Sequence, residues 1–250
     1  MTTGRAQGDR LIETVRETGS TSADLAARLR SGELVSEGYW LVTDRQTAGR
    51  GRQGREWFDG VGNFMGSTVV HRRFGDPEPA TLALVAGLAL HEAVSPCLPV
   101  GTSAILKWPN DVMIADAKLA GILLEREGEA VIVGIGVNLA SAPQLADRRT
   151  TALSAYGTLP DRDDFAATLA RHFATEIERW RNFGMGAIIN RWLAVATPVG
   201  TSLSTGGVGE APLTGGFAGL ADDGAMQLRL ADGTVRVIHA GEVRLADRDR

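Results

Sequence analysis

One segment decides the fold of this chain: Gln46-Thr47-Ala48-Gly49-Arg50-Gly51-Arg52-Gln53-Gly54-Arg55-Glu56-Trp57. Its glycines match the pattern GxGxxG, and residues 39–43 before it read as a buried strand. A dinucleotide-binding fold needs a helix that begins at the third glycine, because the helix N-terminus must meet the pyrophosphate. Residues 55–66 are rich in glycine and aromatic residues and predict no helix. The sequence therefore excludes that fold and predicts a long basic loop over residues 46–62.

Short apolar runs on both sides of this loop predict an α+β fold. Strands are expected over residues 11–18, 39–43, 63–70, 104–107, 112–115, 119–125 and 130–137. Tight connections at 116–117 and 127–129 favour a mostly antiparallel sheet. Helices are expected over residues 23–30, with Thr21 or Ser22 as the N-cap, and over 77–94 and 163–180. These helices would flank a mixed sheet.

The composition changes after Trp192. From Pro198 onward, short apolar runs alternate with glycine- and aspartate-rich turns, and helix signals are absent. Regular spacing of such turns predicts a small all-β barrel. We therefore expect a larger domain over residues 1–195 and a small β domain over residues 196–250.

Length, charge and cysteine content limit the function classes. The chain has 250 residues and a net charge of −4, which argues against a surface built to trap nucleic acid. A single cysteine, Cys97, excludes a disulfide framework and a thiolate zinc site. No apolar run approaches the ~18 residues of a membrane span, and no secretory signal is visible. We expect a cytoplasmic protein that binds neither nucleic acid nor membranes.

The cationic side chains point to anion chemistry. Of the 26 Lys and Arg residues, Lys107 and Lys118 are the only lysines. A lysine retained in so arginine-rich a chain suggests a site that needs a compact ammonium group. In the 46–62 loop, three arginines can neutralise a polyphosphate, the glycines let backbone N–H groups approach an anion, and Trp57 can stack on a flat ring. A solvated basic loop without function remains the alternative.

Two further segments carry candidate site residues. Lys107-Trp108-Pro109-Asn110-Asp111 lies at a strand junction, and Lys118-Leu119-Ala120-Gly121-Ile122 begins a hairpin strand. Such junctions point side chains into the cleft that a sheet lines. A mobile ammonium suits a carboxylate that becomes an acyl phosphate, and an aspartate can hold or deprotonate an incoming amine. Gly134-Ile135-Gly136-Val137-Asn138 is a weaker signal.

In order and spacing, these motifs together with Ser20-Thr21 resemble the motif set of biotin–protein ligases, in a form without an N-terminal DNA-binding domain. The ending Gly241-Glu242-Val243 resembles the small C-terminal SH3-like domain of that family. The resemblance implies a catalytic domain related to class II aminoacyl-tRNA synthetases. It also implies two half-reactions, in which biotin and MgATP form biotinyl-5′-adenylate and a lysine of a biotin carboxyl carrier domain then attacks it.

The resemblance implies roles for the matching positions. Biotin would be bound by Ser20, Thr21, Ser22, Gln46, Gly49, Arg50, Gly51, Arg52 and Lys118. ATP would be bound by Arg50, Arg52, Arg55, Trp57, Lys107, Asn110 and Asn138. The catalytic set would be Arg52, Lys118, Lys107 and Asp111. Ser22 stands where many relatives have asparagine, so its contact departs from the pattern. ATP implies Mg²⁺, but no carboxylate pair marks a metal ligand set.

Two alternative functions stay open and a third is set aside. A lipoate or related acyl ligase shares the implied fold, and a non-catalytic biotin-binding module shares the implied pocket. A transcriptional repressor is set aside because about ten residues precede the first expected strand, too few for a helix-turn-helix. For the oligomeric state we expect a monomer or a weak homodimer.

Overall fold

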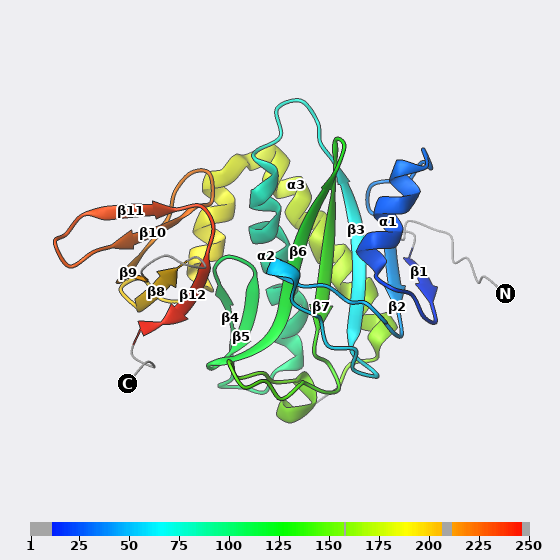
Figure 1. Ribbon diagram of the computed structural model, residues 1–250, viewed down its shortest axis with the longest axis horizontal. Coiled ribbons are helices and arrows are strands. Elements are labelled where there is room, and N and C mark those ends of the chain that lie inside the picture. Colours follow the sequence, from blue (N-terminus) through cyan, green and yellow to red (C-terminus); the bar gives the residue numbers. More distant parts are fainter. Residues whose placement is uncertain (1–11, 158, 207–211, 247–250) are drawn as a thin grey trace.

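The computed structural model describes residues 12–157, 159–206 and 212–246. Its centre is a seven-stranded sheet in the order β1-β2-β3-β7-β6-β5-β4 (Figure 1). Strands β1 and β2 run parallel and the other neighbours antiparallel, which confirms the prediction of a mostly antiparallel sheet. The strands are β1 (Ile12–Val15), β2 (Trp40–Thr43), β3 (Phe64–His71), β4 (Ala104–Lys107), β5 (Asp111–Ile114), β6 (Ala117–Glu127) and β7 (Ala130–Val137).

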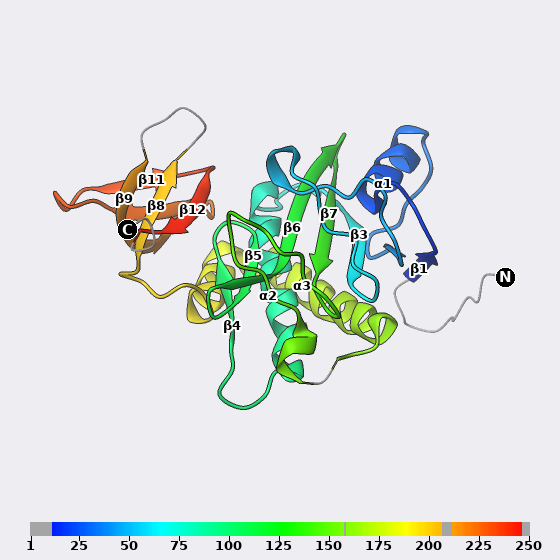
Figure 2. The same cartoon turned by 60° about the horizontal axis from the view of Figure 1, so that its bottom comes forward.

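The strands alternate between two apolar faces, as a side-chain period of two requires. One face, with Trp40, Val42 and Val133, packs against α2 (Leu82–Val94) and α3 (Arg162–Ala194). The opposite face, with Leu41 and Ile132, packs against α1 (Thr21–Arg30). Because α1 covers that face at one end only, as Figure 2 shows, the remainder is available for a site.

All three helices differ from their predicted bounds, and α2 begins at Leu82 rather than at residue 77. Helix α1 begins two residues earlier than expected, and its N-cap is Ser20, whose side chain accepts a hydrogen bond from the N–H of Ala23. The prediction of Thr21 or Ser22 as the cap was therefore wrong. Helix α3 runs beyond residue 180 to Ala194, and Gly184, at φ 70°, interrupts it. Only glycine adopts that conformation without strain, so the helix changes direction there.

The C-terminal part forms a second sheet of five antiparallel strands, in the order β11-β10-β9-β8-β12. Its strands are β8 (Ser202–Gly206), β9 (Leu213–Leu220), β10 (Met226–Arg229), β11 (Val235–Ile238) and β12 (Glu242–Leu245). Residues 207–211, between β8 and β9, lie outside the described residues. Phe217 contacts Trp192 with ring centroids 6.5 Å apart, and the indole N–H of Trp108 donates to the carbonyl of Gly224 at 3.0 Å. The two sheets therefore share buried contacts.

Helix α2 corrects the expectation that no apolar run approaches the length of a membrane span. Within the described ranges, the helical segment Pro79–Cys97 is long and apolar enough to cross a membrane by length and composition. Most of α2 is buried among the sheet and α3. Its composition is therefore that of a core helix.

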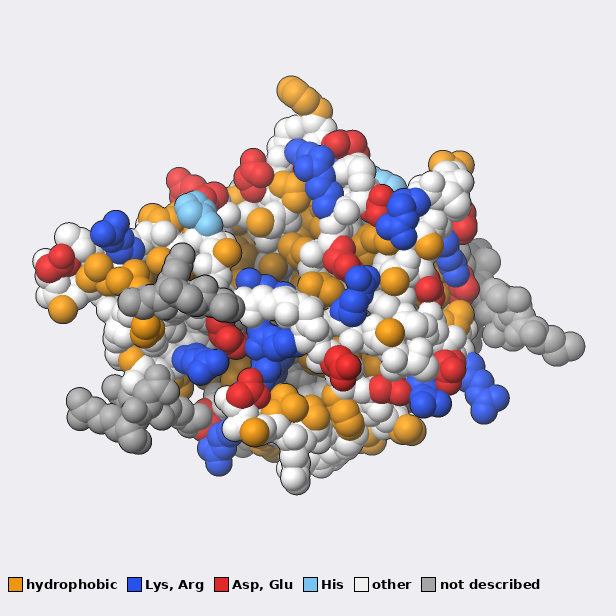
Figure 3. All heavy atoms as spheres, viewed as in Figure 1, with side chains coloured by type: hydrophobic (Ala, Val, Ile, Leu, Met, Phe, Trp, Pro, Cys, Tyr) orange, Lys and Arg blue, Asp and Glu red, His pale blue; other side chains and the backbone are white. Residues whose placement is uncertain are grey.

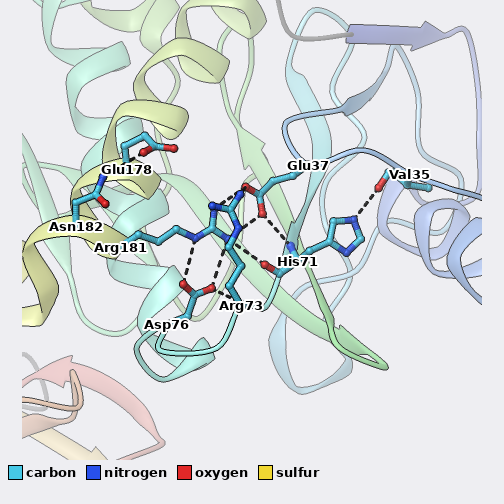
Figure 4. Close-up of polar contacts among 8 residues, drawn as sticks. All are labelled: Val35, Glu37, His71, Arg73, Asp76, Glu178, Arg181 and Asn182. Carbon is cyan, nitrogen blue, oxygen red and sulfur yellow. Dashed lines mark hydrogen bonds and ion pairs between the residues drawn. The ribbon is translucent and has the colours of Figure 1, made fainter.

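An ion network around Arg181 ties three segments together at the end of β3 (Figure 4). The guanidinium donates to both carboxylate oxygens of Glu37, to Asp76 and to the carbonyl of His71. The Arg181 side chain is 7% exposed and that of Asp76 is 6% exposed. Burial alone would raise the pKa of Glu37, but the hydrogen bonds and charge of Arg181, the N–H of His71 and the charge of Arg73 hold it below its ordinary value.

Candidate active site

The face of the sheet left open by α1 forms a cleft of ≈ 820 Å³. Loop residues 46–59 border it on one side, and β12 of the second sheet borders it at the far end. Basic side chains gather at the middle of this face, between the two sheets (Figure 3). All the site residues predicted from the sequence line this cleft: Ser20, Thr21, Ser22, Gln46, Gly49, Arg50, Gly51, Arg52, Arg55, Trp57, Lys107, Asn110, Asp111, Lys118 and Asn138.

One end of the cleft is a buried cluster of hydroxyl groups. The hydroxyl of Thr21 lies 2.7 Å from that of Ser67, which lies 2.9 Å from that of Ser22. The side-chain oxygen of Gln46 accepts from the Thr21 N–H at 2.9 Å. In this way the first turn of α1, the start of the loop and the middle of β3 converge. Groups that both donate and accept hydrogen bonds suit a small polar ring.

Glycines on β6 and β7 make the floor of the cleft. A Cβ at Gly134 would lie 2.6 Å from the Ser22 hydroxyl, and a Cβ at Gly136 would overlap the indole of Trp57. Gly136 pairs with Gly121 of β6, and Trp57 also lies against Gly121. The GxGxN motif therefore leaves room for the hydroxyl cluster and for Trp57 on the same face of one strand, two residues apart.

The middle of the cleft holds the reactive cations. The Lys118 ammonium donates to Asp111 at 2.6 Å and lies 5.8 Å from the ring centre of Trp57. An ammonium has three donors, so those not used by Asp111 can reach a ligand. Arg52 donates to the side-chain oxygen of Asn110 at 3.1 Å, and Asn110 donates in turn to the carbonyl of Ile122 at 2.7 Å. These contacts fix the loop arginine above β5 and β6.

Burial disfavours the charged form of two of these cations. Desolvation lowers the pKa of Lys107, although the carboxylate of Asp111 acts in the opposite direction. Desolvation likewise lowers the pKa of Arg52, again against the charge of Asp111. A polyanion entering the cleft would relieve this cost, so the site favours an anionic ligand.

Two polar atoms in the cleft have no hydrogen-bond partner among the described residues: the indole N–H of Trp57 and the side-chain oxygen of Asn138. Asn138 is 3% exposed, and its NH₂ group donates to the carbonyl of Thr151 at 3.1 Å. Buried polar groups are normally paired, so these two atoms are available to a ligand with both donors and acceptors.

The side chains of two loop arginines pair with carboxylates at different places in the fold. Arg55 pairs with Glu242 of β12 at 2.8 Å, which connects the loop to the second sheet. The guanidinium of Arg50 pairs with Glu125 at 3.1 Å, and Arg50 and Ser20 also border a second hollow beside α1. The side chain of Arg50 therefore lies apart from that of Arg55.

Ser67 and Arg148 are among the lining residues that the sequence analysis did not name. Ser67 sits inside an apolar strand, and only the pairing of Ser67 with Gly134 shows that it faces the cleft. Arg148 follows β7 in an irregular segment with no motif. No signal in a single sequence distinguishes either residue from its neighbours.

The fold and site define a class of protein: one with a cleft on the open face of a mixed sheet, lined by hydroxyl groups at one end and by cations in its middle. Comparisons with known proteins narrow this class. Residues 15–139 match the model of the biotin/lipoate A/B protein ligase family, and residues 206–245 match that of the biotin protein ligase C terminal domain.

Three similar proteins support the same family assignment. A biotin–[acetyl-CoA-carboxylase] ligase from Paracoccus denitrificans is 40% identical, over 90% of this chain and 97% of its own length. The structure of a biotin protein ligase from Aquifex aeolicus in complex with biotin and ATP covers 95% of this chain and 100% of its own, with a TM-score of 0.83 and 26% identity. A biotin protein ligase from Leishmania major in complex with biotinyl-5-AMP covers 92% and 99%, with a TM-score of 0.63 and 27% identity. The chain belongs to the biotin/lipoate A/B protein ligase family.

Proposed function

We propose that this chain is a biotin–protein ligase that joins biotin to a lysine of a biotin carboxyl carrier domain at the expense of ATP. The observation that carries the proposal is a single cleft with a hydroxyl-lined end and a cation-lined end, joined at Lys118 and Trp57. Family membership and the similar proteins that bind biotin with ATP, or biotinyl-5-AMP, support the same substrates.

In the first half-reaction, a carboxylate oxygen of biotin attacks the α-phosphorus of ATP. The bond from that phosphorus to the bridging oxygen of the β-phosphate breaks, and pyrophosphate leaves. Lys118 and Arg52 both line the cleft, and fixed cations beside the developing charge would stabilise the transition state more than the separate substrates. Asn110 holds Arg52 in place at 3.1 Å.

In the second half-reaction, the amine of the acceptor lysine attacks the acyl carbon of the adenylate. An amide bond forms, the bond between the acyl carbon and the phosphate oxygen breaks, and AMP leaves. The incoming amine must lose a proton, and Asp111 is the carboxylate placed to hold or accept it, 2.6 Å from the Lys118 ammonium. Lys107 faces the same region and contributes charge towards the phosphates.

The hydroxyl end suits the ureido ring of biotin. Ser20, Thr21, Ser22 and Gln46 line this end of the cleft, and the backbone from Gly49 to Arg52 would close over the ring. Ser22 stands at the position where the resemblance leads us to expect asparagine. The serine side chain is shorter than asparagine, and it joins the hydroxyl cluster through Ser67 at 2.9 Å.

The other end suits ATP. The unpartnered oxygen of Asn138 can accept from an adenine amino group, and Trp57 offers a ring face. Arg55, Arg52 and Lys107 would bind phosphates. The described ranges 12–157, 159–206 and 212–246 contain no group of three or more His, Cys, Asp or Glu that could hold a metal ion. We therefore propose Mg²⁺ only as an ion carried by the phosphates of ATP and assign it no protein ligands.

The proposal extends to organisation and setting. We propose a catalytic domain over residues 1–195 and an SH3-like domain over 196–250, acting in the cytoplasm as a monomer or weak homodimer without nucleic acid or membrane partners. The acceptor is proposed to be an acetyl-CoA carboxylase component, as the name of the Paracoccus denitrificans relative indicates. The single cysteine fits a reducing compartment.

Transfer of biotin to a purified biotin carboxyl carrier domain tests the proposal. With biotin and MgATP, we expect the acceptor to gain the mass of one biotinyl group, and an acceptor whose target lysine is replaced by arginine should gain none. Transfer of lipoyl but not biotinyl groups would instead support the lipoate ligase alternative. Tight biotin binding without transfer would support a non-catalytic binding module.

A further inference from the structure

An arginine that no motif marks lies at the mouth of the cleft. Arg148 belongs to the segment between β7 and the 3₁₀ turn Leu153–Tyr156, and it lines the cleft with a side chain that is 28% exposed. The same segment pairs with the start of β6: the N–H of Lys118 donates to the carbonyl of Arg149, and the N–H of Thr151 donates to the carbonyl of Lys118, both at 2.9 Å. The backbone of Arg148 is therefore fixed beside the residue that we place at the reaction centre.

Charges from three separate segments meet at this mouth. Arg148 pairs with Asp147 at 3.0 Å, and Arg55 of the loop pairs with Glu242 of β12 at 2.8 Å. The two pairs lie close enough for their charges to act on each other, since Arg148 helps to lower the pKa of Glu242 and Arg55 helps to lower that of Asp147. Arg148 also acts on the ammonium of Lys107. The four side chains form a quartet of two arginines and two carboxylates.

The backbone pairing of residues 149–151 with Lys118 holds this quartet near Lys118, and Glu242 belongs to β12, which borders the cleft at its far end. A chain of phosphates whose α-phosphorus sits beside Lys118 would extend its β- and γ-phosphates towards the mouth. Phosphate groups bear several negative charges and offer arginine two parallel acceptors, so they compete well with a single carboxylate for each guanidinium. The carboxylates keep the arginines in position until then.

We infer that Arg148 is a phosphate-binding residue of this enzyme, which contacts the β- and γ-phosphates of ATP and then the pyrophosphate leaving group, opposite Arg55. The inference rests on the proposed function for the identity of the polyphosphate. It adds a cation from the segment after β7 to the cations of the loop and of β4.

The test measures binding and turnover separately. Binding of the α,β-methylene analogue of ATP, which cannot lose pyrophosphate by the same cleavage, is measured by calorimetry for the wild type, Arg148→Ala, Arg148→Lys and Arg149→Ala. Loss of a charge-assisted contact to phosphate should weaken binding by about tenfold or more in Arg148→Ala. Arg148→Lys should fall in between, because lysine keeps the charge but not the planar fork. Arg149→Ala removes an equal charge from a residue that also borders the cleft, but its side chain is 70% exposed and paired with Asp116, so binding should change less than about twofold.

Steady-state and single-turnover kinetics then show which step of the reaction the Arg148→Ala variant impairs. In Arg148→Ala, the KM for ATP and the inhibition constant of pyrophosphate should rise together, with the KM for biotin and the single-turnover transfer from preformed biotinyl-adenylate unchanged. Analogue binding equal to the wild type, or equal losses in Arg148→Ala and Arg149→Ala, would overturn the inference. So would a defect confined to the transfer step, which would place Arg148 against the acceptor. Absence of biotin-dependent exchange in the wild type would count against the proposed function alone, since the binding measurement does not depend on turnover.

Discussion

Lys118 shows how backbone and side chains together position one ammonium group. The ammonium donates to Asp111 at 2.6 Å and lies 5.8 Å from the ring centre of Trp57. A Cβ at position 121 would come within 3.0 Å of both the Lys118 Nζ atom and the Trp57 ring, so glycine is needed there. The ammonium is therefore held in place as a donor, which is what transition-state stabilisation by a fixed cation requires.

Replacement of Lys118 tests this role. In Lys118→Ala, we expect biotin-dependent adenylate formation to slow by about 10²- to 10³-fold, because a preorganised donor to the developing charge is lost. Thermal unfolding should change little, since the side chain packs against a cleft rather than within a core. Single-turnover formation of biotinyl-adenylate measures the effect. Normal adenylation in a folded Lys118→Ala variant would remove Lys118 from the reaction centre.

Single residues were predictable where chemistry restricts the residue type. Two lysines in an arginine-rich chain, and glycines in a basic loop, are visible in the sequence because other residues would serve most surfaces equally well. Ser67 was not predictable, because a serine in an apolar strand shows its role only once strand pairing places it opposite Gly134. Arg148 was not predictable for the same reason, because only the pairing of residues 149–151 with Lys118 brings its segment to the cleft.

At the scale of elements, local patterns predicted which strands and helices form, but not their ends. The apolar residues spaced along one helix face from Phe165 to Trp180 predict the first part of α3. Nothing in that spacing shows that the helix resumes after Gly184 and continues to Ala194. Packing supplies the reason: Ile188, Ile189 and Trp192 in the second part are buried in the main core. Tertiary contacts, rather than intrinsic helix preference, set the length of this helix.

The Arg181 network gives a prediction at this scale. It connects α3 to the segment before β2 and to the segment after β3 through Glu37 and Asp76 (Figure 4). Arg181→Met leaves the buried Asp76 without its cation and leaves Glu37 paired with Arg73 alone, and we expect a loss of about 3 kcal/mol in the free energy of unfolding. Urea unfolding at neutral pH measures the loss. The control Arg171→Met changes an exposed arginine of the same helix and should stay within about 0.5 kcal/mol.

The pH dependence of this loss follows from the pKa of Glu37. The folded protein holds that pKa below the ordinary value of 4.5, so the stabilisation is fully present above that pH and disappears as the pH falls through the folded pKa. The difference between the wild type and Arg181→Met should therefore shrink under acidic conditions. A difference that stays constant down to strongly acidic pH would show that the network contributes through packing, not charge.

At the scale of the whole molecule, the second sheet packs against α3 and against the turn after β4. Phe217, 2% exposed, packs edge-on against Trp192, and Arg55 reaches Glu242 across the cleft. The composition change after Trp192 predicted where the β-rich part begins. It could not predict this interface, because an interface depends on how two surfaces fit.

Truncation of Phe217 tests whether the two sheets unfold as one unit. Phe217→Ala removes a buried ring between them, and we expect a loss of about 3–5 kcal/mol with a single unfolding transition. Scanning calorimetry of the full chain measures both. Two separate transitions in the wild type, with Phe217→Ala affecting only one of them, would mean that the contact does not couple the sheets.

The central claim is that one cleft activates biotin with ATP. Its most direct measurement is exchange of labelled pyrophosphate into ATP in the presence of Mg²⁺, with biotin, with lipoate and with no added acid, before any acceptor protein is supplied. We predict exchange that depends on biotin alone. Exchange with lipoate instead would keep the fold and the chemistry but contradict the substrate, and no exchange with either acid would contradict the claim that this cleft forms an adenylate.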